Sequence, residues 1–341
     1  MKVFLFGRDN VGWSIDEDRK YAGAFLRELG YMMTSNFLRA DIVHSIWWNL
    51  LLGFKAYPLR RKKIIAVITH EESTDSPEFL KGRRFVNLWI APSQAMYRKL
   101  ELVGADVRYQ PFYVDEKIFT KLDKSKKELA QELGIDYELL RGKFVIISTQ
   151  RDSLGTDLGK PKWQKEPGLL INILSGLPKD KFILLLAGPR RRWVIDQCRE
   201  RHIPYWYYGE EPQGLTDDIW RNTLDKPCIN KLHNLADLYI VSSRSEGGPK
   251  AVLESAFAKT MILSTGVGLA PDFLHPWCIY RTAEEAIPKI KGIMGGEDIA
   301  RFLKANYEKA YSIASYKLVM ERWGEIYGYF EEEYFGLKGW E

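Results

Sequence analysis

Short apolar runs recur along the chain, and most are followed by a polar or glycine-containing loop and then by a helical pattern. The runs are rich in β-branched residues, which is typical of buried parallel strands. They lie at residues 2–7, 41–45, 64–69, 88–91, 144–148, 182–188, 205–208 and 238–241. Strands that alternate with helices predict an α/β fold with parallel sheets.

A charged stretch, residues 121–127, lacks apolar periodicity and predicts a linker. It divides the chain into a first domain, residues 1–122, and a second domain, residues 123–317. A last amphipathic stretch, residues 315–334, predicts a long terminal helix.

The chain has 341 residues, of which 45% are hydrophobic, so it can bury a core large enough for two domains. No segment reaches the ~18 consecutive apolar residues of a membrane span. The start, MKVFLFGRDN, meets charged residues at once and predicts a first strand, not a signal peptide. We therefore expect a cytoplasmic protein.

Cysteine and charge content exclude several classes of protein. The three cysteines are widely spaced and have no histidines near them, which favours neither a disulfide framework nor a zinc site. The formal net charge of +5 is spread along the chain, is compatible with phosphorylated substrates, and accompanies no nucleic-acid-binding module. No G-x-G-x-x-G follows the first strand, which argues against a dinucleotide oxidoreductase.

The stretch SSRSEGGPKAVLE, residues 242–254, connects a strand to a helix and carries the most chemical information. Pro249 suits a first helical position, and Gly247 and Gly248 leave the preceding backbone bare. A bare helix N-terminus attracts anions through its free N–H groups and its dipole. Glu246 lies at the carboxyl end of a strand, where open α/β sheets bind ligands.

Glu254 lies about one and a half turns into this helix, on the side opposite the apolar residues. Alone, it has two interpretations. It is either a ligand-binding carboxylate or a solvated partner for Lys250 at i, i+4.

The Glu-x7-Glu spacing across the glycine loop, followed by residues 264–268 and Pro271-Asp272, resembles the donor-site signature of retaining GT-B glycosyltransferases of family 4. The resemblance implies two Rossmann-like domains with parallel sheets that face each other across a cleft. It also implies that the terminal helix, from about residue 318 to 341, packs on the first domain. The family usually has an aromatic residue where Gly248, Pro249 and Lys250 stand here.

Carried over by motif position, Glu254 would hold the ribose hydroxyls of a nucleotide-sugar. Glu246, Gly247 and Gly248 would address the donor sugar and diphosphate, with Pro249 and Lys250 in the same donor-binding stretch.

The loop of residues 149–167 is long and rich in Gly, Lys and Arg, and long loops are usually functional or mobile. The resemblance assigns Arg151 and Lys165 to a clamp on the donor diphosphate, with Lys160 or Lys162 as alternatives to Lys165. A leaving diphosphate gains charge as the glycosidic bond breaks, and fixed cations stabilise that charge without a metal.

Weaker matches to the family complete the site. The resemblance puts Gly188 close to the nucleotide and Gly209 beside the nucleobase. It puts Gly12, in the first loop, on the acceptor side. His70 ends a strand near the donor sugar and the acceptor, although a surface or capping histidine is the alternative. Residues 190–192 are three arginines that either read a phosphate or begin a solvated helix.

The segment from Trp47 to Lys63 has large apolar residues first and a basic cluster after them. This composition predicts peripheral membrane contact, which would favour a lipid-linked acceptor. The alternative is a helix packed on the sheet and followed by a solvated turn.

The sequence thus predicts a metal-independent, retaining glycosyltransferase without a cofactor. Its donor would be a UDP- or GDP-linked sugar, and its acceptor a carbohydrate, a lipid-linked glycan or another hydroxyl. We expect no Asp-x-Asp metal site, because the acidic pair Asp217-Asp218 lacks that spacing. The alternatives are a GT-B-fold sugar-nucleotide epimerase or hydrolase, and a catalytically silent nucleotide-sugar-binding protein.

Overall fold

The computed structural model describes residues 1–8, 12, 14–53, 59, 61–70, 74–212 and 214–336. Its internal contacts define two compact units. The first unit comprises residues 1–113 together with residues 313–341, and the second comprises residues 114–312. The predicted division behind residue 122 lies a few residues further along the chain.

The first unit is built on a parallel sheet with the strand order β2-β1-β3-β4-β5-β6. Its strands are β1 (Lys2–Phe6), β2 (Met32–Met33), β3 (Ile42–Ser45), β4 (Lys63–Val67), β5 (Leu88–Ala91) and β6 (Val107–Tyr109). Its helices are α1 (Ser14–Glu28), α3 (Pro77–Arg83), α4 (Gln94–Leu102) and α14 (Tyr316–Phe335), with 3-10 turns η1 (Phe37–Arg39) and η2 (Trp48–Gly53).

Both faces of the first sheet are buried, as its continuous apolar strands require. Along β4, Ile65 and Val67 belong to one core cluster, whereas Ile64 and Ala66 belong to the other. Helices α1 and α14 cover the first of these faces, and η2, α3 and α4 supply residues to the second. The terminal helix therefore forms part of the first unit's core.

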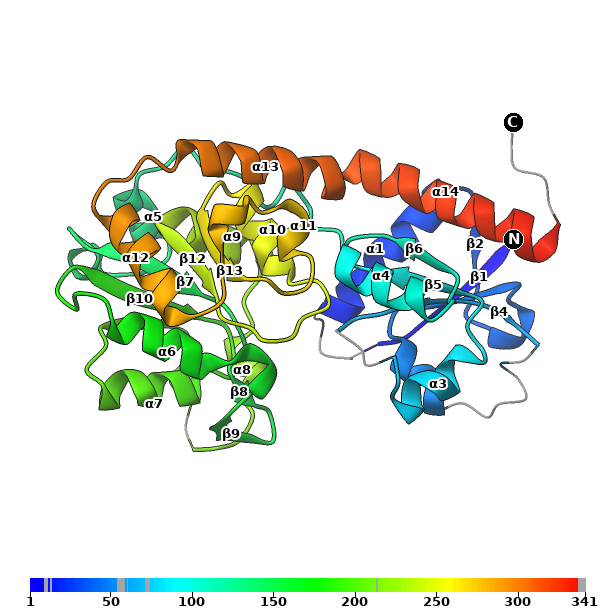
Figure 1. Ribbon diagram of the computed structural model, residues 1–341, viewed down its shortest axis with the longest axis horizontal. Helices are drawn as coiled ribbons and strands as arrows, with labels where there is room; N and C mark the ends of the chain where they lie inside the picture. The colour runs from blue at the N-terminus through cyan, green and yellow to red at the C-terminus, as the bar shows by residue number, and fades with distance from the viewer. Residues whose placement is uncertain are drawn as a thin grey trace. The chain divides into compact units, whose positions relative to one another are not determined.

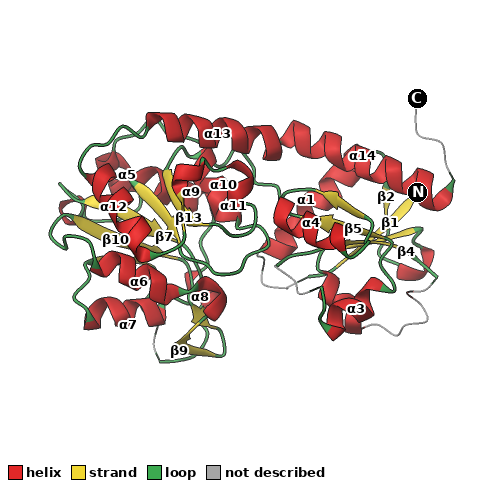
Figure 2. Cartoon of the chain, in the orientation of Figure 1, coloured by secondary structure: helices red, strands yellow, loops and turns green. Residues whose placement is uncertain are grey.

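The second unit is built on another parallel sheet, with the order β11-β10-β7-β12-β13-β14. Its strands are β7 (Phe144–Ser148), β10 (Phe182–Ala187), β11 (Tyr205–Tyr208), β12 (Leu238–Val241), β13 (Met261–Thr265) and β14 (Ile279–Tyr280). Helices α6 and α7 lie on one side of this sheet and α9 and α10 on the other (Figures 1 and 2). The predicted α/β fold with two parallel, Rossmann-like sheets is confirmed.

The remaining elements of the second unit connect these strands. They are α5 (Lys126–Glu132), α6 (Pro167–Ser175), α7 (Arg192–Glu200), α8 (Ile219–Asn222), α9 (Lys226–Leu235), α10 (Lys250–Phe257), α11 (Ala270–Phe273), α12 (Ala283–Met294) and the 3-10 turns η3 (Tyr137–Leu139), η4 (Trp163–Lys165) and η5 (Pro276–Cys278). Helix α13 (Ala300–Ala314) runs across the division between the units.

The predicted linker ends earlier than its charge pattern indicated. Residues 126 and 127 already belong to α5, because Ser125 and Glu128 form a capping box. Such a box satisfies two of the helix's first N–H groups, which an apolar periodicity alone does not reveal.

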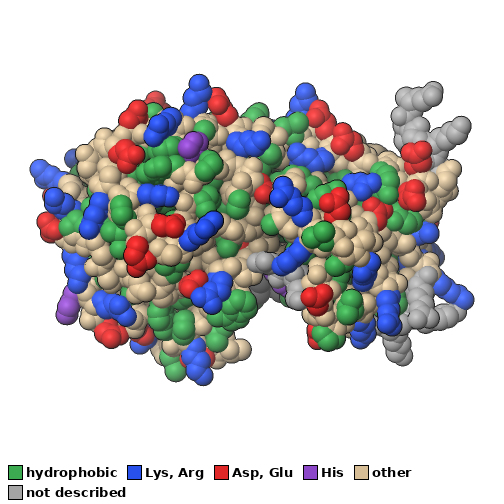
Figure 3. All heavy atoms as spheres, in the orientation of Figure 1, with side chains coloured by type: hydrophobic (Ala, Val, Ile, Leu, Met, Phe, Trp, Pro, Cys, Tyr) green, Lys and Arg blue, Asp and Glu red, His purple; other side chains and the backbone are tan. Residues whose placement is uncertain are grey.

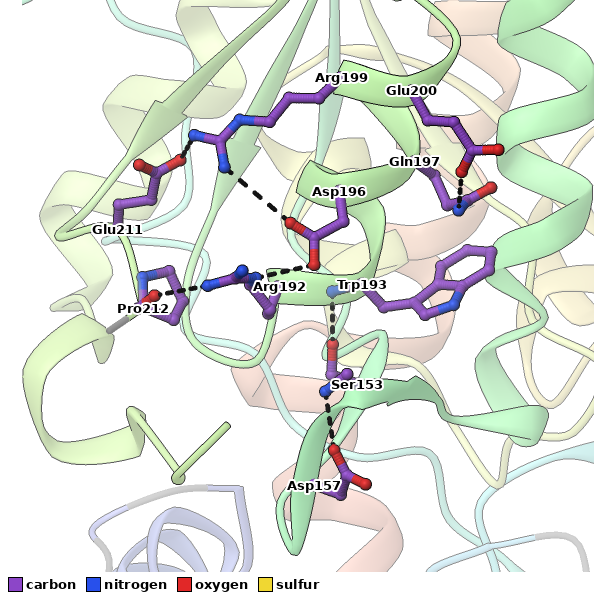
Figure 4. Close-up of polar contacts among 11 residues, drawn as sticks. Ser153, Asp157, Arg192, Trp193, Asp196, Gln197, Arg199, Glu200, Glu211 and Pro212 are labelled. Atoms are coloured by element: carbon purple, nitrogen blue, oxygen red, sulfur yellow. Dashed lines mark hydrogen bonds and ion pairs between the residues drawn. The ribbon is translucent and has the colours of Figure 1, made fainter. Parts of the chain in front are cut away.

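The long loop between β7 and α6 also differs from the expected irregular loop, because it contains an antiparallel hairpin. Its strands are β8 (Ser153–Leu154) and β9 (Asp157–Pro161). The hairpin is anchored to the start of α7, where Ser153 Oγ accepts a 3.0 Å hydrogen bond from the backbone N–H of Trp193 (Figure 4). None of the helices in the described ranges combines the length and the apolar character needed to cross a bilayer.

Candidate functional site

The loops that follow β12 and β13 touch each other at the carboxyl edge of the second sheet. Gly268 has φ +52°, and a side chain there would place its Cβ 2.8 Å from the carbonyl oxygen of Gly247. Thr265 Oγ1 also donates to the carbonyl oxygen of Ser243 at 2.6 Å. Glycine at position 268 therefore allows a close approach that holds the Glu246 loop in place.

Lys165 and Glu246 meet in this loop region, although 81 residues separate them in sequence. They form an ion pair between side chains that are only 16% and 15% exposed. Ser243 Oγ lies 2.8 Å from Glu246 Oε1 and 2.7 Å from Gln150 Oε1, and its single proton serves one of these oxygens at a time. The structure thus brings together two residues that the sequence assigned to one diphosphate site.

A strained turn positions Lys165. Glu166, which follows it, has φ +42°, a left-handed conformation that costs a non-glycine residue about 1–2 kcal/mol. The Arg244 guanidinium donates two hydrogen bonds, of 2.6 and 3.2 Å, to the Glu166 carboxylate. The backbone N–H of Arg244 also donates to the carbonyl oxygen of Gln164 at 2.8 Å. Backbone strain of this kind is found at functional sites, where surrounding contacts over-determine the conformation.

Two further cations, Arg151 and Lys162, lie near Lys165. Burial, and then the charges of Lys165 and Arg151, lower the pKa of Lys162 to about 8. Lys160, by contrast, is 69% exposed and pairs with Asp157 at 3.2 Å. Of the two alternatives that the sequence left open, the hairpin brings Lys162 to the site. We call Arg151, Lys162 and Lys165 the cation cluster.

A buried ion pair lies close to the cation cluster. Arg191 Nη2 is 2.8 Å from Asp152 Oδ2, with both side chains fully buried, and it donates to Ser148 Oγ at 3.0 Å. Burial raises the pKa of Asp152 to about 6, although Arg191 and then Lys165 oppose the rise. This pair could not be predicted from the sequence, because neither residue stands in an apolar pattern.

The other two arginines of residues 190–192 are bound to neighbouring loops. Arg190 pairs with Asp217 at 2.6 Å, and Arg192 bridges Asp196 at 2.7 Å and the carbonyl oxygen of Pro212 at 3.0 Å (Figure 4). These contacts fasten the start of α7, and the residue just before it, to the loop after β11. The arginine run is therefore not a solvated helix start, and its role as a phosphate ligand stays a prediction.

Glu254, on α10, faces a fully buried histidine. Its Oε2 lies 3.9 Å from His233 Nε2, and its side chain is 16% exposed. Ser255 Oγ donates to the carbonyl oxygen of Ala251 at 2.7 Å, so it accepts the 3.1 Å bond from His233 Nδ1. This places a proton on Nδ1, and the buried Nε2, which has no hydrogen-bond partner among the described residues, faces Glu254.

The two glycines expected near the nucleotide end neighbouring strands. Gly188 has φ +83°, and its carbonyl oxygen accepts a 3.0 Å bond from Tyr207. After Gly209, the backbone N–H of Glu210 donates to Asn222 Oδ1 at 2.7 Å. This oxygen leaves no room for a Cβ at position 209. Both therefore lie at the ligand-binding edge of the second sheet.

The residues expected on the acceptor side belong to the first unit. His70 is exposed just beyond β4, with its Nδ1 3.4 Å from Thr69 Oγ1. Gly12 is exposed, has φ +72° and donates its N–H to Asp16 at 3.0 Å, shortly before α1. The structure thus places each of them in a surface loop of that unit.

The predicted membrane segment, residues 47–63, is described only in part, because residues 54–58 and 60 lie outside the described residues. Its apolar start does not face solvent. Trp48 is fully buried and packs edge-on against Phe79 and Trp89 in the first unit's core. This half of the segment follows the alternative interpretation, although it forms a 3-10 turn and not an α-helix.

Within the described parts of the chain, no group of three or more His, Cys, Asp or Glu side chains could hold a metal ion. On the face in Figure 3, Lys and Arg side chains are interspersed with Asp and Glu. That face does not present the single-signed patch that nucleic acids require.

Comparison with known proteins places this geometry in context. No family model matches the chain, and no curated protein matches it in sequence. Among solved structures, it is similar to Anabaena HepE in complex with UDP and glucose, with a TM-score of 0.70, 14% identity, and coverage of 96% of this chain and 99% of that one. The chain has the GT-B fold.

Two further GT-B structures agree. A glycosyltransferase from Rickettsia africae has a TM-score of 0.64 at 14% identity, over 97% of this chain and 99% of that one. Sucrose-phosphate synthase from Thermosynechococcus elongatus has a TM-score of 0.60 at 13% identity, over 92% of this chain and 78% of that one. At such low identity, these matches establish the fold alone.

Proposed function

We propose that this protein transfers a sugar from a nucleoside-diphosphate sugar to a hydroxyl acceptor, with retention of configuration and without a metal. The observation that carries the proposal is the meeting of the cation cluster with Glu246 at the carboxyl ends of β7 and β12. Such an edge is where α/β sheets bind ligands. HepE, which shares the fold, has been crystallised with UDP and with UDP-glucose.

The cation cluster would bind the diphosphate. Lys165 is held by Glu246, so a diphosphate would replace that carboxylate as its partner and leave Glu246 for a hydroxyl of the donor sugar. Helix α10 has no side-chain cap at Pro249, so the backbone N–H groups of its first turn would add to the site. Gly247 and Gly248 leave that approach uncovered, and Lys250 lies in the first turn.

Glu254 would bind the ribose hydroxyls through its carboxylate. His233 is fully buried and would lie behind Glu254, with its Nε2 3.9 Å from Glu254 Oε2. Gly188 and Gly209 would border the nucleotide from the next strands.

In the reaction, the leaving diphosphate would take the acceptor's proton on the same face of the sugar. Charge grows on the diphosphate as the glycosidic bond breaks, and preorganised cations lower the barrier because they favour that state over the ground state. The acceptor would be a carbohydrate or lipid-linked hydroxyl beside His70 and Gly12. Membrane contact for a lipid-linked acceptor would rest on the basic end of residues 47–63 and not on its buried apolar start.

The test is thermal unfolding of wild type and Glu254→Ala with UDP, GDP, ADP and TDP. A ligand at 100 times its dissociation constant stabilises a protein by about 2.7 kcal/mol, so one nucleotide should raise the wild-type melting temperature. In Glu254→Ala, loss of the charged contact to the ribose should weaken binding of that nucleotide by about 1.5–3 kcal/mol.

Glu308→Ala is the matched control, because Glu308 is 62% exposed on α13. The nucleotide should raise the melting temperature of this variant as much as it raises that of wild type. No stabilisation by any nucleotide, or an equal one in Glu254→Ala, would contradict the site. Release of free sugar or an epimer without an acceptor would contradict transfer and favour the hydrolase or epimerase.

A further inference from the structure

The first unit contains a strongly basic hollow of about 680 Å³. It lies at the carboxyl ends of β1 and β2, beside α1, in the size range of ligand pockets. Its lining residues are Leu5, Arg8, Asp16, Arg19, Lys20, Gly23, Arg27, Met33, Thr34 and Ser35. We call this set the basic hollow.

The basic side chains come from one stripe of α1 and from the loop after β1. Asp16, Lys20, Gly23 and Arg27 recur at three- and four-residue spacings, so they share one face of the helix. Gly23 lies on this stripe between Lys20 and Arg27, and a Cβ there would stand 3.7 Å from Arg27 Nη2, at ordinary van der Waals contact.

The charges of the basic hollow do not cancel. Four of its residues are cationic, and Asp16 is the one carboxylate among those described. No carboxylate within the described ranges forms an ion pair with Arg8, Lys20 or Arg27, and Arg19 binds the carbonyl oxygen of Leu5. Burial, and then the neighbouring charge of Arg8, lower the pKa of Arg19, whereas Asp16 opposes this shift.

Gathered like charges cost stability unless an anion binds between them. A single carboxylate would leave most of this charge uncompensated, whereas a phosphate monoester carries close to two charges and three strong acceptor oxygens. Guanidinium groups match those oxygens with paired N–H donors. Thr34 adds a hydroxyl, because its Oγ1 accepts from Asn36 N at 3.1 Å and keeps its own proton to donate.

We propose that the basic hollow binds a phosphate group carried by the acceptor. That the phosphate belongs to an acceptor rests on the proposed glycosyl transfer, whereas phosphate binding itself does not. The phosphate would come either from a soluble sugar phosphate or from a lipid headgroup.

Titration calorimetry with inorganic phosphate, in chloride buffer of matched ionic strength and with UDP present, tests the hollow. Arg27→Gln should weaken phosphate binding about tenfold or more, the usual effect of losing one charge-assisted contact. A variant that combines Arg8→Gln, Lys20→Gln and Arg27→Gln should abolish this binding. Its melting temperature without phosphate should equal or exceed that of wild type, because like charges are removed.

Arg98→Gln is the matched control, since Arg98 is an exposed arginine on α4 of the same unit, outside the hollow. It should bind phosphate as wild type does. Equal phosphate affinity in wild type and the triple variant would overturn the proposal. So would equal losses in Arg98→Gln and Arg27→Gln.

Two further ligands distinguish the sources of the phosphate. Glucose 6-phosphate is compared with glucose, and phosphatidylcholine vesicles with phosphatidic acid are compared with vesicles without it. Binding that is lost in the triple variant supports the corresponding source, and binding of neither contradicts an acceptor phosphate. The UDP response, measured in the same samples, separates the outcomes, because it depends on the second unit alone. If UDP does not bind but phosphate still does, the proposed glycosyl transfer is contradicted, whereas the proposed phosphate binding in the basic hollow is supported.

Discussion

The two units handle charge differently. In the second unit, three of the site's cations are paired with carboxylates, Lys165 with Glu246, Arg244 with Glu166, and Arg191 with Asp152, although Lys162 lies among like charges. In the basic hollow of the first unit, the four cations outnumber the single carboxylate among the described lining residues.

This difference has a consequence for how each site selects a ligand. A diphosphate that enters the second unit must replace Glu246 as the partner of Lys165, so it gains only the difference between two good contacts. A phosphate in the basic hollow displaces no internal carboxylate from Arg27 or Lys20 among the residues described. The diphosphate site of the second unit therefore favours a large ligand with many contacts, whereas the basic hollow of the first unit needs only a compact anion.

The largest expected effect is on the buried pair. Arg191→Gln should destabilise the protein by about 3–5 kcal/mol, because it leaves Asp152 buried without its partner. Burial already raises the pKa of Asp152 to about 6, and loss of Arg191 raises it further. The neutral acid needs no partner, so the deficit should be smaller at about pH 5 than at about pH 8. Urea unfolding at both values measures it.

Arg27→Gln, in the other unit, is the counterpart of that variant. It should change the free energy of unfolding by less than about 0.5 kcal/mol or raise it, as exposed positions do. If both arginines cost the same stability, the contrast between paired and unpaired charge is wrong.

The next effect distinguishes the roles of Lys165 and Glu246, which form the ion pair of the candidate site. Lys165→Gln should weaken UDP binding by about 1.5–3 kcal/mol, because a charge-assisted contact to the diphosphate is lost. Glu246→Gln should leave UDP binding equal or tighter, since Lys165 no longer has an internal partner, while sugar transfer falls. Calorimetry and transfer assays measure the two effects. Parallel losses of UDP affinity in both variants would exclude the exchange of partners.

A smaller effect concerns pH. Because burial and neighbouring cations lower the pKa of Lys162 to about 8, it is charged below that pH and neutral above it. UDP affinity should therefore fall, by up to about tenfold, as the pH rises from about 7 to about 9. Lys162→Gln should flatten this profile in calorimetry. A profile that keeps its slope in the variant would assign the titration to another group.

The smallest effect is expected at Lys160, which pairs with Asp157 in solvent. Lys160→Gln should change UDP affinity by less than about 0.5 kcal/mol. A loss as large as that of Lys165→Gln would mean that the hairpin presents Lys160 to the ligand after all.

Much of the fold could be predicted because its strands are short, continuous apolar runs. The β12 and β10 runs are buried on both faces, so nothing polar interrupts their pattern. The hairpin of β8 and β9 could not be predicted in this way. Residues 157–161 are largely polar, the last three of them are exposed, and the hairpin is anchored by a contact between Ser153 and the start of α7.

Members of the candidate site could be proposed from the sequence where a motif contains them, but not where only the folded structure brings them together. Glu246 and Glu254 stand in a recognisable spacing, and the order along the chain indicated Lys165. His233, by contrast, lies in an ordinary helix, and only the folded chain sets it against Glu254. The basic hollow was hidden for a similar reason, because Arg8 and Arg27 are far apart in sequence and the net charge is only +5.

The terminal helix has a consequence for biosynthesis. One face of the first sheet is covered partly by α14, whose fully buried residues include Val319, Tyr327 and Phe330. These residues leave the ribosome after all of residues 114–312, so the second unit can complete its core while the first still exposes an apolar face. The part of the protein made first is thus the last to finish folding, and it needs protection from aggregation in the interval.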